Sequence, residues 1–115
     1  MKIYIESISE ELKQKVKGFL RAHNATLVDY RTWREALNLH KEVSDEIMKN
    51  DEEYREEYQT IIDYYYENHK NDELNAYEIR LMNETSQKLK SLDARYIRNE
   101  EINDLLNQLL EKMYK

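Results

Sequence analysis

Residues 52–67 read EEYREEYQTIIDYYYE and separate into two faces when they are placed on an α-helix. At about 100° per residue, the apolar positions gather within an arc of roughly 100°, which is typical of a helix lying on a core. These positions are Tyr54, Tyr58, Ile61, Ile62 and Tyr65. On the opposite side fall Glu52, Glu53, Glu56, Asp63 and Glu67. The stretch therefore predicts an amphipathic helix with an acidic outer face.

The segments on either side of this stretch carry the same helical spacing. Thr32 followed by Glu35 forms a capping box, and Asn50-Asp51, Asn71-Asp72 and Asn99 are candidate helix boundaries. The last helix, from Glu100, has the widest apolar arc. The apolar positions are Trp33, Ala36, Leu37, His40, Val43 and Ile47; then Leu74, Leu81, Met82, Thr85, Leu89, Leu92 and Tyr96; then Ile102, Leu105, Leu106, Leu109, Leu110 and Met113.

The N-terminal third allows two interpretations. Residues 2–6 and 26–30 are short β-prone runs, and between them Ser7 and Glu10 form a capping box ahead of helically spaced apolar residues. If both runs are parallel strands, residues 1–31 form a compact β-α-β start. The alternative is a fully helical bundle with irregular ends.

Bulk composition favours one mostly α-helical domain over residues 1–115, with about four to five helices, of which 32–115 form a bundle. The 115 residues include one glycine and no proline, and chains so poor in backbone breakers are usually helical. There is no cysteine, so disulfides and thiolate chemistry are excluded, and cytoplasm is the expected location. No signal peptide or membrane span is expected, because every apolar run is short.

Motifs for catalysis and cofactor binding are missing from the sequence. A phosphate-binding loop, a dinucleotide fingerprint or a nucleophile elbow needs several glycines, whereas this chain has only Gly18. The histidines His23, His40 and His69 show no i,i+3 or i,i+4 pairing with one another, so structural roles are favoured over metal ligation. We therefore expect no enzyme, cofactor or metal. The competing hypothesis is an unfamiliar enzyme that uses His40 or His69 with neighbouring acids, Asp72 and Glu73 in the case of His69.

Charge is concentrated in the middle of the chain. Residues 44–78 contain three basic residues (Lys or Arg) and twelve acidic residues (Asp or Glu), a net charge of −9, whereas the net charge of the whole chain is −6. Such a surface repels nucleic acid and attracts basic protein surfaces. Acids on the preceding helix extend this surface if the two outer faces merge. They are Glu35, Glu42, Asp45 and Glu46.

Tyrosines flank the acidic face. In the run Tyr64-Tyr65-Tyr66 only the central residue joins the apolar stripe, which leaves Tyr64 and Tyr66 either as contact residues for a partner or as rings lying along the core edge. We predict a protein-binding site made of Glu52, Glu53, Glu56, Asp63, Tyr64, Tyr66 and Glu67. A basic flank of Arg80, Lys88, Arg95 and Arg98 is expected to pair with the acidic helix of the same chain or of a second copy.

The function predicted from these features is a non-enzymatic protein-binding module with an acidic surface that mimics nucleic acid. In size, acidity and richness in Lys, Asn, Ile and Tyr the chain is similar to small accessory proteins of phages and mobile elements of AT-rich bacteria, a likeness that implies an inhibitor of a host protein. The alternative is a structural or scaffold protein that forms a homodimer through its leucine-rich C-terminal helix.

Overall fold

The computed structural model describes residues 8–23, 30–49 and 51–111, and within these ranges it contains five α-helices and no strand. The prediction of a mostly α-helical bundle is confirmed. The expected strand at residues 2–6 lies outside the described residues, as do residues 26–29 of the second one. Tyr30, its last residue, begins a helix instead. The helices are α1 Glu10–Ala22, α2 Tyr30–Ile47, α3 Glu52–Asn68, α4 Ala76–Tyr96 and α5 Glu100–Glu111.

Side-chain caps set several helix starts. Ser9 accepts the Leu12 N–H at 3.2 Å ahead of α1, whereas the predicted cap, Ser7, lies outside the described residues. Asp51 caps α3 as expected. The cap of α4 is Asn75, which accepts the Glu78 N–H at 2.9 Å, so the prediction of a start at Asn71-Asp72 is wrong. Leu74 therefore lies in the connecting loop, 39% exposed, and not on the apolar stripe.

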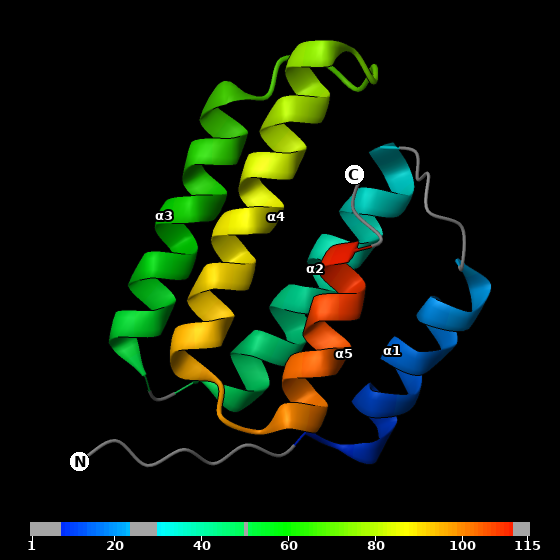
Figure 1. Ribbon diagram of the computed structural model, residues 1–115, viewed down its shortest axis with the longest axis vertical. Coiled ribbons are helices and arrows are strands. Elements are labelled where there is room, and N and C mark those ends of the chain that lie inside the picture. The colour runs from blue at the N-terminus through cyan, green and yellow to red at the C-terminus, as the bar shows by residue number, and fades with distance from the viewer. Residues whose placement is uncertain (1–7, 24–29, 50, 112–115) are drawn as a thin grey trace.

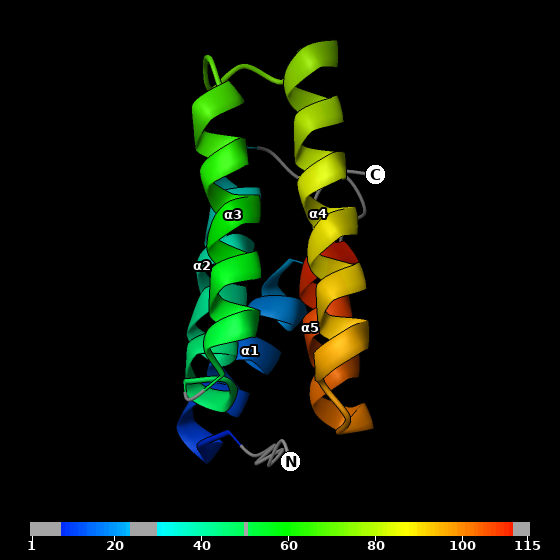
Figure 2. The same ribbon diagram turned by 90° about the vertical axis from the view of Figure 1, so that its left-hand side faces the viewer.

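The helices pack in two layers with α1 at one edge. Figure 1 shows α3 and α4 as an antiparallel hairpin, with α5 between α4 and α1. Turned by 90°, α2 and α3 form one layer and α4 and α5 the other (Figure 2). Across the layers, α3 packs on α4 and α2 packs on α5, while α1 packs on α2 and α5. The outer face of α3 is thus an edge of the molecule, on the side away from α1 (Figure 1).

The core lies between the layers and includes all five helices. Trp33, Tyr65 and Leu106 are fully buried, and so is Val16 of α1. The apolar residues of α5 are covered by the helices of the same chain: Ile102, Leu105, Leu106, Leu109 and Leu110 are between 0% and 7% exposed. The described part of α5, which leaves out Met113, therefore has no open apolar face.

Candidate binding surface

The seven residues of the predicted site all lie on α3, and the side chain of each is exposed. Three buried tyrosines, Tyr54, Tyr58 and Tyr65, hold the opposite side of this helix in the core. Because they fix the rotation of α3, the helix presents a fixed set of side chains to solvent. The predicted separation of an apolar inner face from an acidic outer face is confirmed, with Ile61 and Ile62 half-buried at the boundary.

Four carboxylates form a row along the outermost line of α3, which we call the acidic row: Glu52, Glu56, Asp63 and Glu67. At about 100° per residue they fall within an arc of roughly 60°. From Glu52 to Glu67 the row is about 22 Å long, given 1.5 Å of rise per residue. Within the described part of the chain no lysine or arginine pairs with Glu52, Glu56 or Glu67, and Asp63 accepts only a hydrogen bond from Gln59, at 2.7 Å.

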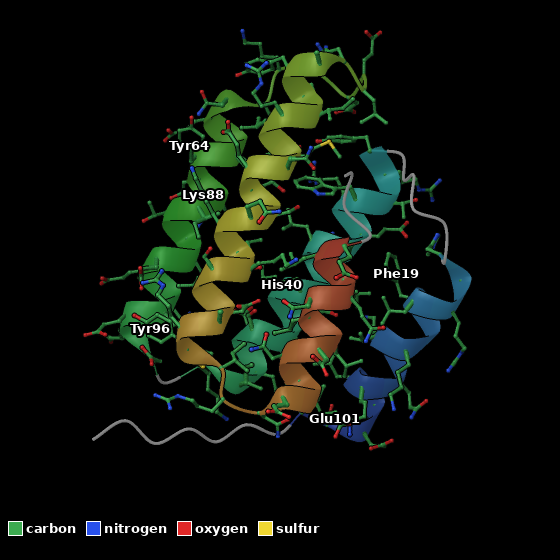
Figure 3. The ribbon with its side chains drawn as sticks, in the orientation of Figure 1. Phe19, His40, Tyr64, Lys88, Tyr96 and Glu101 are labelled. Atoms are coloured by element: carbon green, nitrogen blue, oxygen red, sulfur yellow. The ribbon has the colours of Figure 1, made fainter. Side chains whose placement is uncertain are left out.

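Tyr64 and Tyr66 lie on opposite flanks of the acidic row. Figure 3 shows Tyr64 of α3 beside Lys88 of α4, whose Nζ atom lies 4.1 Å from the centre of the tyrosine ring. Tyr66 faces α2, where the Arg34 guanidinium lies 5.1 Å from its ring. Each tyrosine is 44% exposed, and its ring lies against a cation of its own chain. Such exposed cation–π contacts stabilise by about 0.5–1 kcal/mol, so they hold the rings in place without burying them.

The flank toward α4 is a shallow groove in which opposite charges meet. Arg95 donates to Glu57 at 3.0 Å, and the Tyr96 hydroxyl donates to the same carboxylate at 2.7 Å. The basic flank therefore contacts α3 within one chain, as an ion pair between Arg95 and Glu57 and as a contact of Lys88 with the Tyr64 ring. The groove has a volume of about 580 Å³ and is lined by Glu56, Glu57, Thr60, Ile61, Gln87, Lys88, Ser91 and Arg95.

The acids of α2 do not extend the acidic row. Glu42 pairs with Lys15 of α1 at 3.1 Å, and Glu46 accepts the Ser9 N–H at 2.6 Å. Since α1 and α3 lie at opposite edges (Figure 1), the expected merging of the two acidic faces is wrong for these residues. Glu35 and Asp45 pair along α2 itself, with Arg31 and Lys41.

A buried polar cluster, which sequence reasoning missed, connects α2, α3 and α4. His40 is fully buried, with Nε2 2.7 Å from an Asp93 oxygen and Nδ1 3.0 Å from the Tyr58 hydroxyl. The Tyr54 hydroxyl lies 2.8 Å from the other Asp93 oxygen and 3.0 Å from Ser44 Oγ. The sequence places His40 on the apolar stripe of its helix, but nothing in it pairs that residue with Asp93.

The cluster includes a serine, a histidine and an aspartate, the residue types of a hydrolase triad. Ser44 Oγ lies 3.4 Å from His40 Nδ1, yet all three side chains are at most 2% exposed. In this conformation a substrate atom has no access, and both ring nitrogens are occupied by protein groups. Burial, together with the negative charge of Asp93, raises the pKa of the Tyr54 and Tyr58 phenols well above the usual value. The cluster is therefore arranged to hold three helices together.

A second polar cluster, around His69, lies at the end of α3 where the chain turns into α4. The fully buried Glu78 carboxylate accepts the Lys70 N–H at 2.9 Å and the Asn71 N–H at 3.3 Å, and lies 2.7 Å from His69 Nδ1. Burial opposes its ionisation, but these hydrogen bonds outweigh it and lower the pKa of Glu78. Of the two acids expected beside His69, Asp72 is in contact at 3.2 Å, and Glu78 takes the place of Glu73. Within residues 8–23, 30–49 and 51–111, no cluster of three or more His, Asp or Glu side chains is arranged to hold a metal ion.

Comparison with protein-family models, with curated proteins and with solved structures finds no match for this chain. Of the five helices described, none has both the length and the apolar character that crossing a membrane requires.

Proposed function

We propose that the protein is a non-enzymatic binding module that associates with another protein through the acidic row of α3 and its flanking tyrosines. The observation that supports this proposal is the row itself, four carboxylates of which none has a cationic partner within the described chain. Acids that face a neighbouring helix are instead neutralised, as Glu57 is by Arg95 and Glu42 by Lys15. Negative charge thus remains where an outside partner would meet it.

The partner that fits this surface is a protein with a basic groove or patch. An uncompensated row about 22 Å long steers basic surfaces toward it and repels nucleic acid. Glu52 with Glu56 and Asp63 with Glu67 are i,i+4 pairs, so negative charge recurs regularly along the row. A groove that binds nucleic acid accepts such a pattern, which makes inhibition of a nucleic-acid-binding protein the specific form of this proposal.

The test compares two variants with the same change in charge. The row variant carries Glu52→Gln, Glu56→Gln, Asp63→Asn and Glu67→Gln. The control variant carries Glu73→Gln, Glu84→Gln, Asp104→Asn and Glu111→Gln, four exposed acids outside the row. Each protein is immobilised and exposed to cell lysate at about 0.01 M and 0.15 M salt, where the Debye length falls from about 30 Å to 8 Å. Captured proteins are identified by mass spectrometry.

We expect the wild type and the control variant to capture the same salt-sensitive basic protein, and the row variant to lose it. With that protein purified, the association rate constant of the row variant should be lower by about tenfold or more, because complementary charge mainly speeds the diffusional encounter of two proteins. Its stability should hold or rise slightly, since like-charge i,i+4 pairs cost about 0.2–0.5 kcal/mol each. Equal capture by the row variant would show that the acidic row serves only solubility.

A further inference from the structure

The His69 ring lies where α2, α3, α4 and the α3–α4 loop meet. It stacks on Tyr30 of α2, with ring centres 4.9 Å apart and planes 11° apart, and on Tyr65 of α3 at 5.3 Å and 17°. Its side chain is 15% exposed. The charged and titratable groups that face it are Tyr30 and Arg34 from α2, Tyr65 from α3, Asp72 from the loop and Glu78 from α4.

The hydrogen bonds around Tyr30 assign the tautomer of His69. The Tyr30 oxygen accepts from Arg34 at 2.8 Å and from the Tyr65 hydroxyl at 3.3 Å. Its own proton therefore points to the remaining neighbour, His69 Nε2, at 2.8 Å. Nε2 must then be without a proton, so Nδ1 carries one and donates it to Glu78 at 2.7 Å. In this arrangement the hydroxyl protons of Tyr30 and Tyr65 and the ring proton of His69 each have an acceptor.

A proton added to Nε2 changes this pattern. The nitrogen becomes a donor, and the Tyr30 hydroxyl loses the acceptor of its proton. A second acceptor is already in place, because Asp72 Oδ1 lies 3.2 Å from Nε2. Nε2 thus has two alternative partners, one on α2 for the neutral ring and one in the loop for the charged ring.

We propose that His69 is a proton-operated latch that ties Tyr30 of α2 to the end of α3 when neutral and releases Tyr30 in favour of Asp72 when protonated. Histidine is the side chain whose charge ordinarily changes between about pH 5 and 8, which sets the pH range of the test. The inference is independent of the proposed function. The change at Tyr30 reaches two neighbours: Trp33, whose ring centre lies 6.4 Å from that of Tyr30, and Arg34, whose guanidinium also lies over Tyr66.

The first test follows the wild-type protein by NMR between about pH 8 and pH 5. At the higher pH, Nε2 of His69 should give the ¹⁵N signal of a bare ring nitrogen and Nδ1 that of a protonated one. On acidification Nε2 should gain a proton, and the Tyr30 ring signals and the fluorescence of Trp33, the only tryptophan, should change with the same midpoint. His69→Gln should abolish that transition, and His23→Gln on α1 should leave it intact.

Two matched variants test the second partner. The Asp72 side chain is 80% exposed, so Asp72→Asn should fold, and it removes the negative charge that favours the protonated ring while it keeps an acceptor oxygen. The midpoint of the His69 transition should then move to lower pH. Glu73→Gln makes the same charge change one residue away and should move it much less. The latch is refuted if Nε2 carries its proton already at pH 8, if Tyr30 and Trp33 do not follow His69, or if Asp72→Asn and Glu73→Gln shift the midpoint equally.

Discussion

At the scale of single residues, Gly18 is a position where the helix is weaker than the fold requires. It lies in the middle of α1, and a Cβ atom built there meets nothing within 4 Å. Glycine in a helix interior costs about 0.5–1 kcal/mol relative to alanine, because it loses more backbone freedom on folding. Gly18→Ala should raise the free energy of unfolding by that amount in urea denaturation. A loss of stability would mean that the outer face of α1 is covered in solution.

Glu78 is the single residue with the clearest pH dependence. Its pKa is lowered in the folded protein, so its contribution to stability is complete above the ordinary value of about 4.5. That contribution is lost as the pH falls through the lower, folded-state value. Glu78→Gln should cost about 1.5–3 kcal/mol at neutral pH, the range for a hydrogen bond to a charged group.

The same variant should lose less stability than the wild type between neutral pH and pH 3, because it no longer takes up a proton at this site on unfolding. Urea unfolding at both pH values measures the difference. As a control, Glu84→Gln removes an exposed acid from the same helix and should leave the pH dependence close to that of the wild type. Equal slopes for Glu78→Gln and wild type would show that the carboxylate is not held as an anion in solution.

At the scale of the elements, helix positions were predictable from the sequence, but some boundaries were not. The 3.6-residue period depends only on the chain itself, and it located the segments that became α2 to α5. The sequence predicted the start of α4 at Asn71-Asp72. The structure uses Asn75, and the Glu78 carboxylate binds the N–H groups of Lys70 and Asn71. The start of α4 thus depends on a buried side chain of α4 that binds the preceding loop, and local sequence does not reveal such a contact.

The same limit applies to the candidate binding surface. The acidic row follows from angular position on one helix, so the sequence was sufficient to predict it. The removal of Glu42 and Glu46 from that surface depends on α1 packing against α2, which no local pattern encodes. Likewise the leucine-rich arc of α5 suggested an interface, whereas packing on three helices of its own chain accounts for its width.

At the scale of the whole molecule, large side chains bridge the spacing between α2 and α3. The backbones of these two helices make few close contacts, and aromatic rings fill the space between them. The ring centres of Trp33 and Tyr65 are 4.7 Å apart, and those of His40 and Tyr58 are 5.5 Å apart. Asp93 then joins both helices to α4 through His40 and Tyr54. His40 and Asp93 are 53 residues apart in sequence, so this connection depends on the completed fold.

This interpretation predicts strong energetic coupling between His40 and Asp93. Removing one partner of a buried, hydrogen-bonded pair leaves the other unsatisfied and costs about 3–5 kcal/mol. His40→Ala and Asp93→Ala should each cost roughly that much, and the double variant should cost less than their sum by about 1–3 kcal/mol, measured by urea denaturation at neutral pH.

The matched control is the pair Lys13–Glu101, between α1 and α5, whose nitrogen and oxygen atoms are 2.8 Å apart against 2.7 Å for His40–Asp93. The Glu101 side chain is 62% exposed, so solvent screens the pair and its coupling should be much smaller than that of His40 with Asp93. Because the two distances are nearly equal, the separation of the two groups does not account for a difference in coupling. Coupling of similar size in both cycles would mean that the buried cluster does not hold the layers together, and that the aromatic packing of α2 on α3 alone sets their spacing.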